Sequence, residues 1–171
     1  SARGIQEEFG YTPEITPTMT WLLAEDFKTT GLNGDPDCYQ DPPLDQSPRN
    51  DFYWFIRNVG RSGKSGAERG RWGLGKIVYP AASRIRSFFA YSVQEGSLRN
   101  LLIGRSVLSI HHLKGHQHDS EGYFGEYLDK EAEYFATPSE DTELIEEFRK
   151  QFQVRRKPTD PGLTIAIPFP D

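Results

Sequence analysis

Residues 58–76, with the sequence NVGRSGKSGAERGRWGLGK, limit the fold of this chain more than any other segment. Glycine recurs every few residues, and each interior glycine destabilises a helix by about 1 kcal/mol. Val59, Trp72 and Leu74 are the side chains in this stretch that could enter a core. The apolar segments on either side must therefore supply the core. The stretch itself is either a mobile loop or a place where backbone approaches an anion.

The same stretch is the centre of a local positive charge. Residues 57–76 have a net charge of +5, whereas the rest of the chain has −10 and the whole chain −5. A cationic segment in an acidic chain is typical of a local anion site rather than of a surface that follows a nucleic acid. We therefore do not expect nucleic acid as a partner. A solvated, disordered loop would have the same composition.

Length and composition predict one globular domain. The chain has 171 residues, 36% of them hydrophobic and 26% charged, which is ordinary for a single domain. No apolar run approaches the ~20 residues of a membrane span, and residues 1–10 lack the apolar core of a secretion signal. A single cysteine, Cys38, favours a reducing compartment. We expect a cytoplasmic protein without membrane association, with an irregular lead-in over 1–18 and one domain over 19–171.

Short apolar segments separated by turn-forming residues predict a mixed α and β fold. Strands are expected over 19–25 and 162–170. The segments RSFFAYSV and LLIGRSVLSIHHL flank QEGSLRN and predict a β-hairpin. Residues 51–58 suit either a strand or a short buried helix. The expected fold class is α+β, a two-layer sandwich with a mixed, mostly antiparallel sheet.

The clearest helix is expected over residues 137–152, TPSEDTELIEEFRKQF. Thr137 would be its N-cap, Pro138 its first residue, and Glu140 would complete a capping box. One face of this helix is apolar and predicts packing on the sheet; it consists of Leu144, Ile145, Phe148 and Phe152. The RRK sequence at 155–157 is interpreted as a solvated helix exit.

Two alternatives for the glycine-rich stretch fail. A P-loop needs a glycine five residues before the glycine of its GK pair, and the chain has Asn58 there. A helix would also have to begin at Lys64, within a segment that contains three glycines. A flexible linker joins folded units, whereas here an apolar segment abuts each end within one small domain. The remaining interpretation is a mobile lid that leads into a phosphate-binding segment, GRWGLGK, whose glycines let backbone N–H groups turn toward an anion.

These motifs resemble the GHKL ATPase superfamily, which comprises gyrase B, the large heat-shock chaperone, sensor histidine kinases and MutL. Chaperone members have a lid of the form N-L-G-x-x-x-K-S-G, followed by G-x-F-G-x-G before a helix and a strand. The chain has, in this order, Asn58, Val59, Gly60, Lys64, Ser65, Gly66, Gly70, Trp72, Gly73 and Gly75. The family's acidic box, D-x-G-x-G after a strand, is matched by LLAEDFKTTGL with Asp26. The resemblance covers about residues 19–170 and is greatest to large, uncharacterised bacterial proteins whose ATP-binding part carries GRWGLGK.

The resemblance implies a GHKL-type domain that binds ATP, with Mg²⁺ as the accompanying ion. A buried Asp26 would accept a hydrogen bond from the exocyclic amine of adenine, supported by Thr164 of the last strand, with Gly31 in the acidic box. The implied phosphate and lid residues are Gly60, Ser62, Lys64, Ser65, Gly70, Gly73, Leu74, Gly75 and Lys76. The lid would span about residues 58–72 and close over the nucleotide.

The chain departs from the family in two places. Lys28 stands where the acidic box has its first glycine, and Gly31 lies one residue beyond the place of the second. Lys28 would either obstruct the nucleotide or contact its phosphates. The family's first helix carries a glutamate that activates water and an asparagine that holds Mg²⁺; residues 1–18 offer Glu7 and Glu8 but no such asparagine. No catalytic residue is assigned, and hydrolysis by this chain alone is not expected.

The expected function is a nucleotide-gated conformational switch in a larger bacterial protein, whose other parts or a second copy would be the partner. The alternative is a degenerate GHKL scaffold that binds other proteins without nucleotide. A third reading is a nucleic-acid contact through the cationic lid, with a steep salt dependence.

Two other clusters favour structural roles. Four histidines, His111, His112, His116 and His118, lie near Asp119, but no cysteine or glutamate at a known ligand spacing accompanies them, so no metal is assigned. The aromatic run Phe52, Tyr53, Trp54 and Phe55 could stack nucleic-acid bases. Four consecutive side chains point in different directions, so most of them are expected in the core.

Overall fold

The structure is a computed structural model that describes residues 19–38, 49–57, 77–130 and 133–171. The expected lead-in over 1–18 and the expected lid over 58–72 lie outside the described residues.

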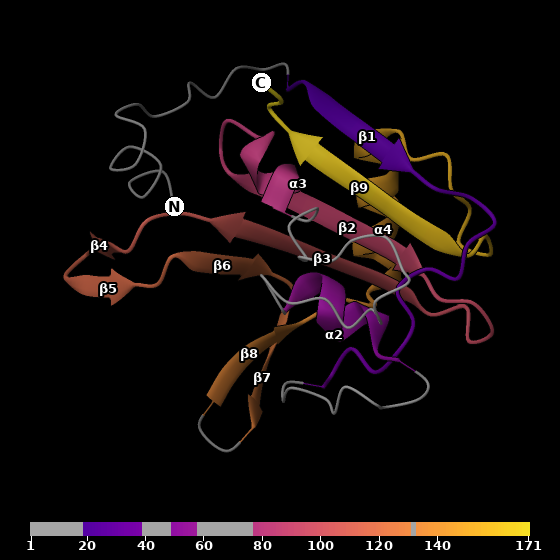
Figure 1. Cartoon of the computed structure of the whole chain (residues 1–171), viewed down its shortest axis with the longest axis horizontal. Helices are drawn as coiled ribbons and strands as arrows, with labels where there is room; N and C mark the ends of the chain where they lie inside the picture. The colour runs from indigo at the N-terminus through magenta and orange to yellow at the C-terminus, as the bar shows by residue number, and fades with distance from the viewer. Residues whose placement is uncertain (1–18, 39–48, 58–76, 131–132) are drawn as a thin grey trace, which may run out of the picture.

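Five strands form one sheet in the order β1-β9-β2-β3-β6 (Figure 1). They are β1 (Trp21–Glu25), β2 (Ser87–Val93), β3 (Asn100–Val107), β6 (Glu121–Phe124) and β9 (Gly162–Pro168). Every neighbouring pair is antiparallel, which confirms a mostly antiparallel sheet in a mixed α and β fold. Because β9 lies between β1 and β2, the end of the chain joins its first described strand to the central hairpin.

The predicted hairpin around QEGSLRN is confirmed. β2 and β3 pair from Ser87↔Ser106 to Val93↔Asn100. Gln94 donates its backbone N–H to Arg99 O at 3.0 Å, and Gly96 takes a positive φ of 83° in the turn, a conformation that glycine adopts readily. The strands expected over 19–25 and 162–170 are also present, as β1 and β9.

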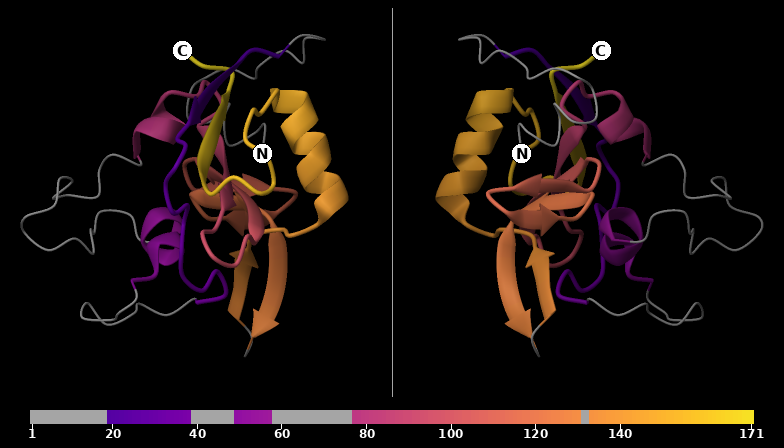
Figure 2. Two further views of the ribbon diagram at one scale, coloured as in Figure 1. Left: turned by 90° about the vertical axis from the view of Figure 1, so that its right-hand side faces the viewer. Right: turned by 90° about the vertical axis from the view of Figure 1, so that its left-hand side faces the viewer.

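The two faces of the sheet bury separate apolar clusters, because side chains along a strand alternate between faces. The helices of the described segments are α2 (Asp51–Ile56), α3 (Val78–Ala81) and α4 (Thr142–Phe152). On one face Ile165 of β9 packs with Phe52 of α2; on the other, Ala166 packs with Phe148 of α4. Figure 2 shows α4 on one side of the sheet and α2 and α3 on the other. Helices thus cover both faces, whereas the two-layer expectation placed them on one.

The aromatic run over 51–58 resolves into a helix rather than a strand. Asn50 caps α2, because its Oδ1 accepts a hydrogen bond from the Tyr53 backbone N–H at 2.9 Å. Phe52, Tyr53 and Trp54 are buried and Phe55 is half-buried. The prediction that most of this run belongs to the core is therefore confirmed.

The predicted start of the long helix is wrong. α4 begins at Thr142, and its N-cap is Asp141, whose Oδ1 accepts hydrogen bonds from the Glu143 and Leu144 backbone N–H groups at 2.9 and 3.3 Å. Thr137 instead ends a strand, and Ser139 exchanges two backbone hydrogen bonds with Leu102 of β3. This extended pairing to a distant strand overrides the local capping signal at Thr137, Pro138 and Glu140.

Two hairpins lie apart from the main sheet (Figure 1). One pairs β4 (His111–Leu113) with β5 (His116–His118), and the other pairs β7 (Glu126–Lys130) with β8 (Glu133–Thr137). Among the helices that the structure describes, none is long and apolar enough to cross a membrane.

The cap of α4 generates a stability prediction. Replacing Asp141 with alanine removes the acceptor for two helix N–H groups and should lower the free energy of unfolding by about 1 kcal/mol. Asp141→Asn keeps an acceptor oxygen and should retain most of that stability. Urea denaturation of the three proteins measures both effects; an equal loss in the two variants would contradict the assigned cap.

Candidate functional site

Asp26 lies at the point where β1 ends and is held in one orientation by backbone and side-chain donors. Its backbone N–H donates to Leu163 O at 3.0 Å. Its carboxylate Oδ1 accepts hydrogen bonds from the Leu163 backbone N–H at 2.6 Å and from Thr29 Oγ1 at 2.8 Å. Arg156 Nη2 lies 3.3 Å from the same oxygen. Within the described residues every recorded bond to the carboxylate uses Oδ1, and the side chain is 49% exposed, so Oδ2 can accept from a ligand.

The turn after Asp26 brings the chain back onto the sheet. Lys28 has a φ of 60° and Gly31 a φ of 69°. A side chain at Gly31 would collide with the carbonyl oxygen of Val93 at the end of β2, so this position needs glycine both for conformation and for space. The next residue, Leu32, donates its backbone N–H to Ser92 Oγ at 2.8 Å and is buried. Gly31 therefore fixes the distance between the turn and the sheet.

Lys28 adopts a conformation that glycine prefers, in the position where the family motif has glycine. A left-handed backbone is strained for a side chain such as lysine, by about 1–2 kcal/mol. The exposed lysine side chain thus stands two residues after Asp26 on a turn whose backbone has a glycine-like shape.

The burial of Arg156 is the largest difference between the structure and the prediction from sequence. The RRK sequence was predicted to be solvated; Arg155 and Lys157 are exposed, but Arg156 is fully buried. Its guanidinium donates to Thr164 Oγ1 and to the backbone carbonyl oxygens of Asp160, Pro161, Leu163 and Asp26. It also lies 5.1 Å from the ring centroid of Phe27. A cationic triplet before proline contains no signal that distinguishes the buried arginine from its two exposed neighbours.

Thr164 does not support Asp26 in the way that the resemblance implied. Its hydroxyl donates to Glu25 Oε2 at 3.2 Å and accepts from Arg156 Nε at 3.1 Å. The Glu25 carboxylate also accepts from the backbone N–H groups of Arg155 and Arg156. Side chains alternate along β1 and β9, so the Thr164 side chain lies on the same face as that of Glu25 and on the opposite face from that of Asp26. The Leu163 backbone amide is the group that supports the Asp26 carboxylate.

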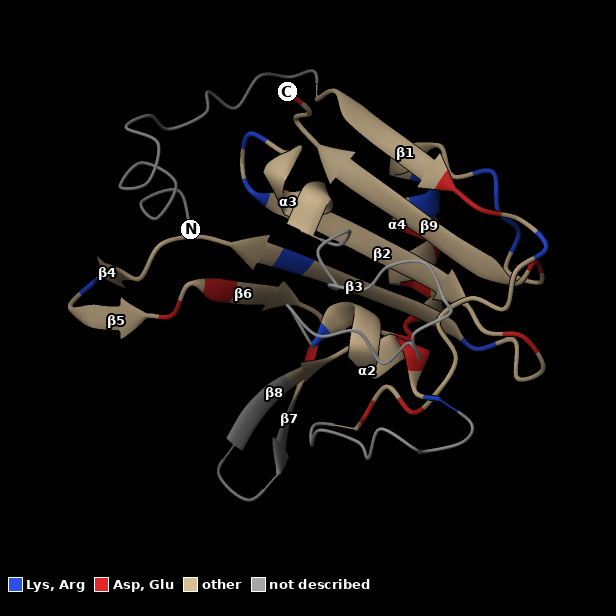
Figure 3. Ribbon diagram, in the orientation of Figure 1, with Lys and Arg blue, Asp and Glu red and all other residues tan. Residues whose placement is uncertain are grey.

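Acidic and basic groups are therefore interleaved at this end of the sheet. Glu25 is the last residue of β1, and Asp26 follows it directly. Basic residues come from the turn after Asp26 and from the connection between α4 and β9 (Figure 3). Arg156 is committed to internal carbonyl groups. The exposed cations Lys28 and Arg155 remain accessible to a ligand at this edge.

The helices that bracket the glycine-rich stretch belong to the face near Asp26. α2 ends at Ile56, before the stretch, and α3 begins at Val78, after it. Ile56 belongs to an apolar cluster against which Tyr79 of α3 also packs. Burial raises the pKa of the Tyr79 hydroxyl, and the negative charge of Asp26 raises it further.

All nine of the predicted phosphate and lid residues lie outside the described residues: Gly60, Ser62, Lys64, Ser65, Gly70, Gly73, Leu74, Gly75 and Lys76. Asp26, Gly31 and Thr164 are described, and the structure brings all three to the end of the sheet where β1 stops and β9 begins.

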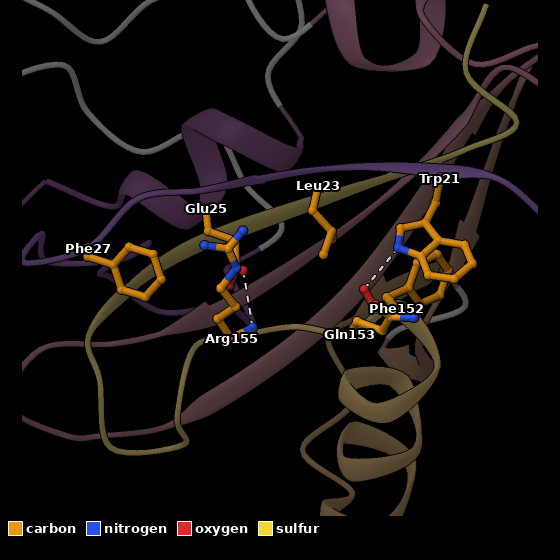
Figure 4. A pocket seen from close by; sticks show the side chains of 7 residues that line it. All are labelled: Trp21, Leu23, Glu25, Phe27, Phe152, Gln153 and Arg155. Atoms are coloured by element: carbon orange, nitrogen blue, oxygen red, sulfur yellow. Dashed lines mark hydrogen bonds between the residues drawn. The ribbon is translucent and has the colours of Figure 1, made fainter.

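Two grooves in the described part of the chain do not include Asp26 in their lining. One, of about 450 Å³, runs between β1 and the end of α4 and is shown in Figure 4. The other, of about 560 Å³, lies beside the histidine hairpin, where the rings of His111 and His118 stack at 5.4 Å. Across the described parts of the chain, no group of three or more histidine, cysteine or acidic side chains is arranged to hold a metal ion.

Comparisons of the chain with protein-family models, with curated proteins and with solved structures found no match. The candidate site consequently depends on the geometry around Asp26 and on the sequence motifs.

The burial of Arg156 generates a second stability prediction. Arg156→Met keeps most of the side-chain length but leaves several buried carbonyl groups without a donor, so the free energy of unfolding should fall by about 3 kcal/mol or more. Arg155→Met is the matched control: its exposed side chain should change stability by less than about 0.5 kcal/mol. Thermal and urea denaturation distinguish the two, and similar losses in both variants would contradict the role of Arg156.

Proposed function

We propose that this chain is an ATP-binding domain of GHKL type that acts as a nucleotide-gated switch in a larger bacterial protein. The observation that carries the proposal is the Asp26 carboxylate, which is braced through Oδ1 and leaves Oδ2 to accept a hydrogen bond. A carboxylate held in this way can accept from the exocyclic amine of adenine. Guanine has a carbonyl oxygen at that place and would meet repulsion, so the interaction favours ATP over GTP.

The turn around Asp26 supports the proposal independently of the carboxylate. Lys28 has a left-handed backbone where the acidic box of the family has glycine, and Gly31 approaches the sheet too closely for any side chain. Lys28 thus has a backbone conformation that glycine adopts readily, although it is a lysine and Gly31 lies one residue beyond the second glycine position of the motif.

The phosphates would bind to the glycine-rich stretch. The segment 70–76 offers backbone N–H groups at Gly73, Leu74 and Gly75, and Lys64 and Lys76 offer positive charge. In the sequence this stretch joins α2 to α3. In this proposal adenine binds at Asp26, the phosphates bind at residues 70–76, and the lid of residues 58–72 closes over the nucleotide.

Magnesium would neutralise the triphosphate, but no residue for it is assigned. The sequence contains no counterpart to the asparagine that holds the ion in the family. The proposed output is accordingly a conformational change upon binding. Hydrolysis by this chain alone is not proposed.

A second candidate function is a partner-binding scaffold that has lost nucleotide binding. Two observations favour it: the Asp26 carboxylate already accepts from internal donors, and Lys28 replaces a glycine of the motif. This candidate requires that Mg-ATP leave the melting temperature unchanged at millimolar concentration.

Titration with a fluorescent ATP analogue, in competition with ATP and with GTP, tests the proposal. Asp26→Asn is nearly isosteric and keeps an acceptor for Leu163 N–H, but it places an amide donor opposite the adenine amine. We expect this variant to lower ATP affinity by about tenfold to a hundredfold. Asp119→Asn, an exposed residue in the connection between β5 and β6, is the matched control and should bind as the unaltered chain does.

A thermal-shift measurement separates the two candidates. For a dissociation constant of ~10 μM, 1 mM Mg-ATP should stabilise the folded chain by about 2.7 kcal/mol. Equal affinity for ATP and GTP would contradict the assignment of adenine to Asp26. An Asp26→Asn variant that binds ATP as tightly as the unaltered chain would contradict it as well. A melting temperature indifferent to both nucleotides would favour the scaffold instead.

A further inference from the structure

Strand β1 is the terminal strand of the main sheet on its β9 side (Figure 1). In the part of the chain that the structure describes, no other strand pairs with its outer edge. A strand with an open edge presents a row of N–H and C=O groups that can pair with another chain.

The hydrogen bonds to β9 show which residues of β1 face outward. Asp26 donates its N–H to Leu163 O, and Thr20 O accepts from Phe169 N–H. In an antiparallel pair both backbone groups of one residue point to the same side, and the side alternates from residue to residue. Even-numbered residues of β1 therefore face β9. The outward backbone groups belong to Trp21, Leu23 and Glu25.

Within the described residues, β1 carries no lysine, proline or bulge that would oppose pairing at this edge. Natural edge strands often carry lysine, proline or a bulge, whereas β1 has the sequence WLLAE and pairs regularly with β9 from Trp21 to Glu25. Leu22 is 51% exposed and Ala24 is also exposed, both on the face opposite α4. In the described part of the chain this edge is short, mostly apolar and without a strand partner.

We propose that β1 pairs with β1 of a second copy of this chain, antiparallel and centred on Leu23, so that two sheets join into one. The inference does not rest on nucleotide binding. Its basis is that the strand is complementary to itself in this register, with Leu23 opposite Leu23 of the second copy, Trp21 opposite Glu25, and Leu22 opposite Ala24.

Each part of that register is chemically consistent. The pairs formed by Trp21, Leu23 and Glu25 use the outward backbone groups, and each pair can exchange two hydrogen bonds. Leu22 and Ala24 meet on the other face, so the exposed leucine gains an apolar neighbour. The charge of Glu25 lies opposite an uncharged tryptophan, so no like charges face each other across the strand pair.

A second copy fits better than an unrelated peptide because the centred register uses all five residues of β1. A twofold axis at Leu23 gives an isologous contact, the commonest kind in homodimers. The groove between β1 and the end of α4 continues the contact: Trp21, Leu23 and Glu25 line it on the same face, beside Phe152 and Arg155 (Figure 4). Paired residues share a face, so the grooves of the two copies would meet at the axis.

A contact of five residues on each side is small, so we expect a weak dimer whose population rises with concentration. Sedimentation equilibrium of the 171-residue chain, at loading concentrations up to about 1 mM, measures the association. A chain that stays monomeric over this range overturns the proposal.

Charge at the symmetry axis gives the sharpest test. In the proposed register residue 23 lies opposite itself, so Leu23→Lys places two like charges together, and so does Leu23→Glu. Each variant alone should raise the dissociation constant by at least about tenfold. An equimolar mixture of the two places opposite charges at the axis and should recover association as a heterodimer. Ile110→Lys removes an exposed apolar side chain between β3 and β4 and should dimerise as the unaltered chain does.

Hydrogen exchange locates the contact even if a substitution at Leu23 weakens folding. In the monomer the amides of Trp21, Leu23 and Glu25 face outward, whereas those of Leu22 and Ala24 are bonded to β9. Raising the concentration of the unaltered chain should slow exchange at the first set and leave the second set unchanged. Dimerisation without this alternating protection, or heterodimers that fail to form from the two charged variants, would place the contact elsewhere and refute the register.

Discussion

The buried guanidinium of Arg156 holds together the end of the sheet on which the candidate site is built. β1 and β9 are separated by most of the chain, and the connection from α4 must turn sharply to enter β9. Arg156 donates to the carbonyl groups of Asp160 and Pro161 in that connection, of Leu163 in β9, and of Asp26. A buried arginine is stable only when its donors are matched, and here they are matched to backbone. The end of β1 therefore has one defined position relative to β9.

Strand β1 links the two proposals physically. Asp26 follows its last residue, and its outer edge, centred on Leu23, is open in the described part of the sheet. Any ligand that displaced Asp26 would act on the same strand that would form the dimer contact. Among the described strands β1 pairs with β9 alone, so one ladder of hydrogen bonds and the Arg156 network hold it in position. The nucleotide proposal and the dimer proposal nonetheless make separate demands, one on a carboxylate and the other on backbone groups.

Local pattern was sufficient for several elements and insufficient where distant segments compete. The β2–β3 hairpin and the strands β1 and β9 follow from short apolar runs bounded by turn residues. The start of α4 could not be read locally, because Thr137, Pro138 and Glu140 form a good capping pattern that the pairing of Ser139 with Leu102 overrides. The sequence also did not predict that helices cover both faces of the sheet. Whether a short segment such as Asp51–Ile56 covers one face or the other depends on its tertiary contacts.

Sequence alone determined that the chain is mixed α and β, that Asp26 follows a predicted strand in a sequence that resembles an acidic box, and that its cationic charge is concentrated in one glycine-rich stretch. These properties depend on residue type and on spacing along the chain. The tertiary structure decided that Arg156 is buried while Arg155 is exposed, that Leu163 rather than Thr164 supports Asp26, and that β1 is the terminal strand of the described sheet. These three properties depend on which strands are neighbours and on which face of the sheet each side chain lies. Hydrogen bonds between β1 and β9, more than a hundred residues apart in the sequence, set both.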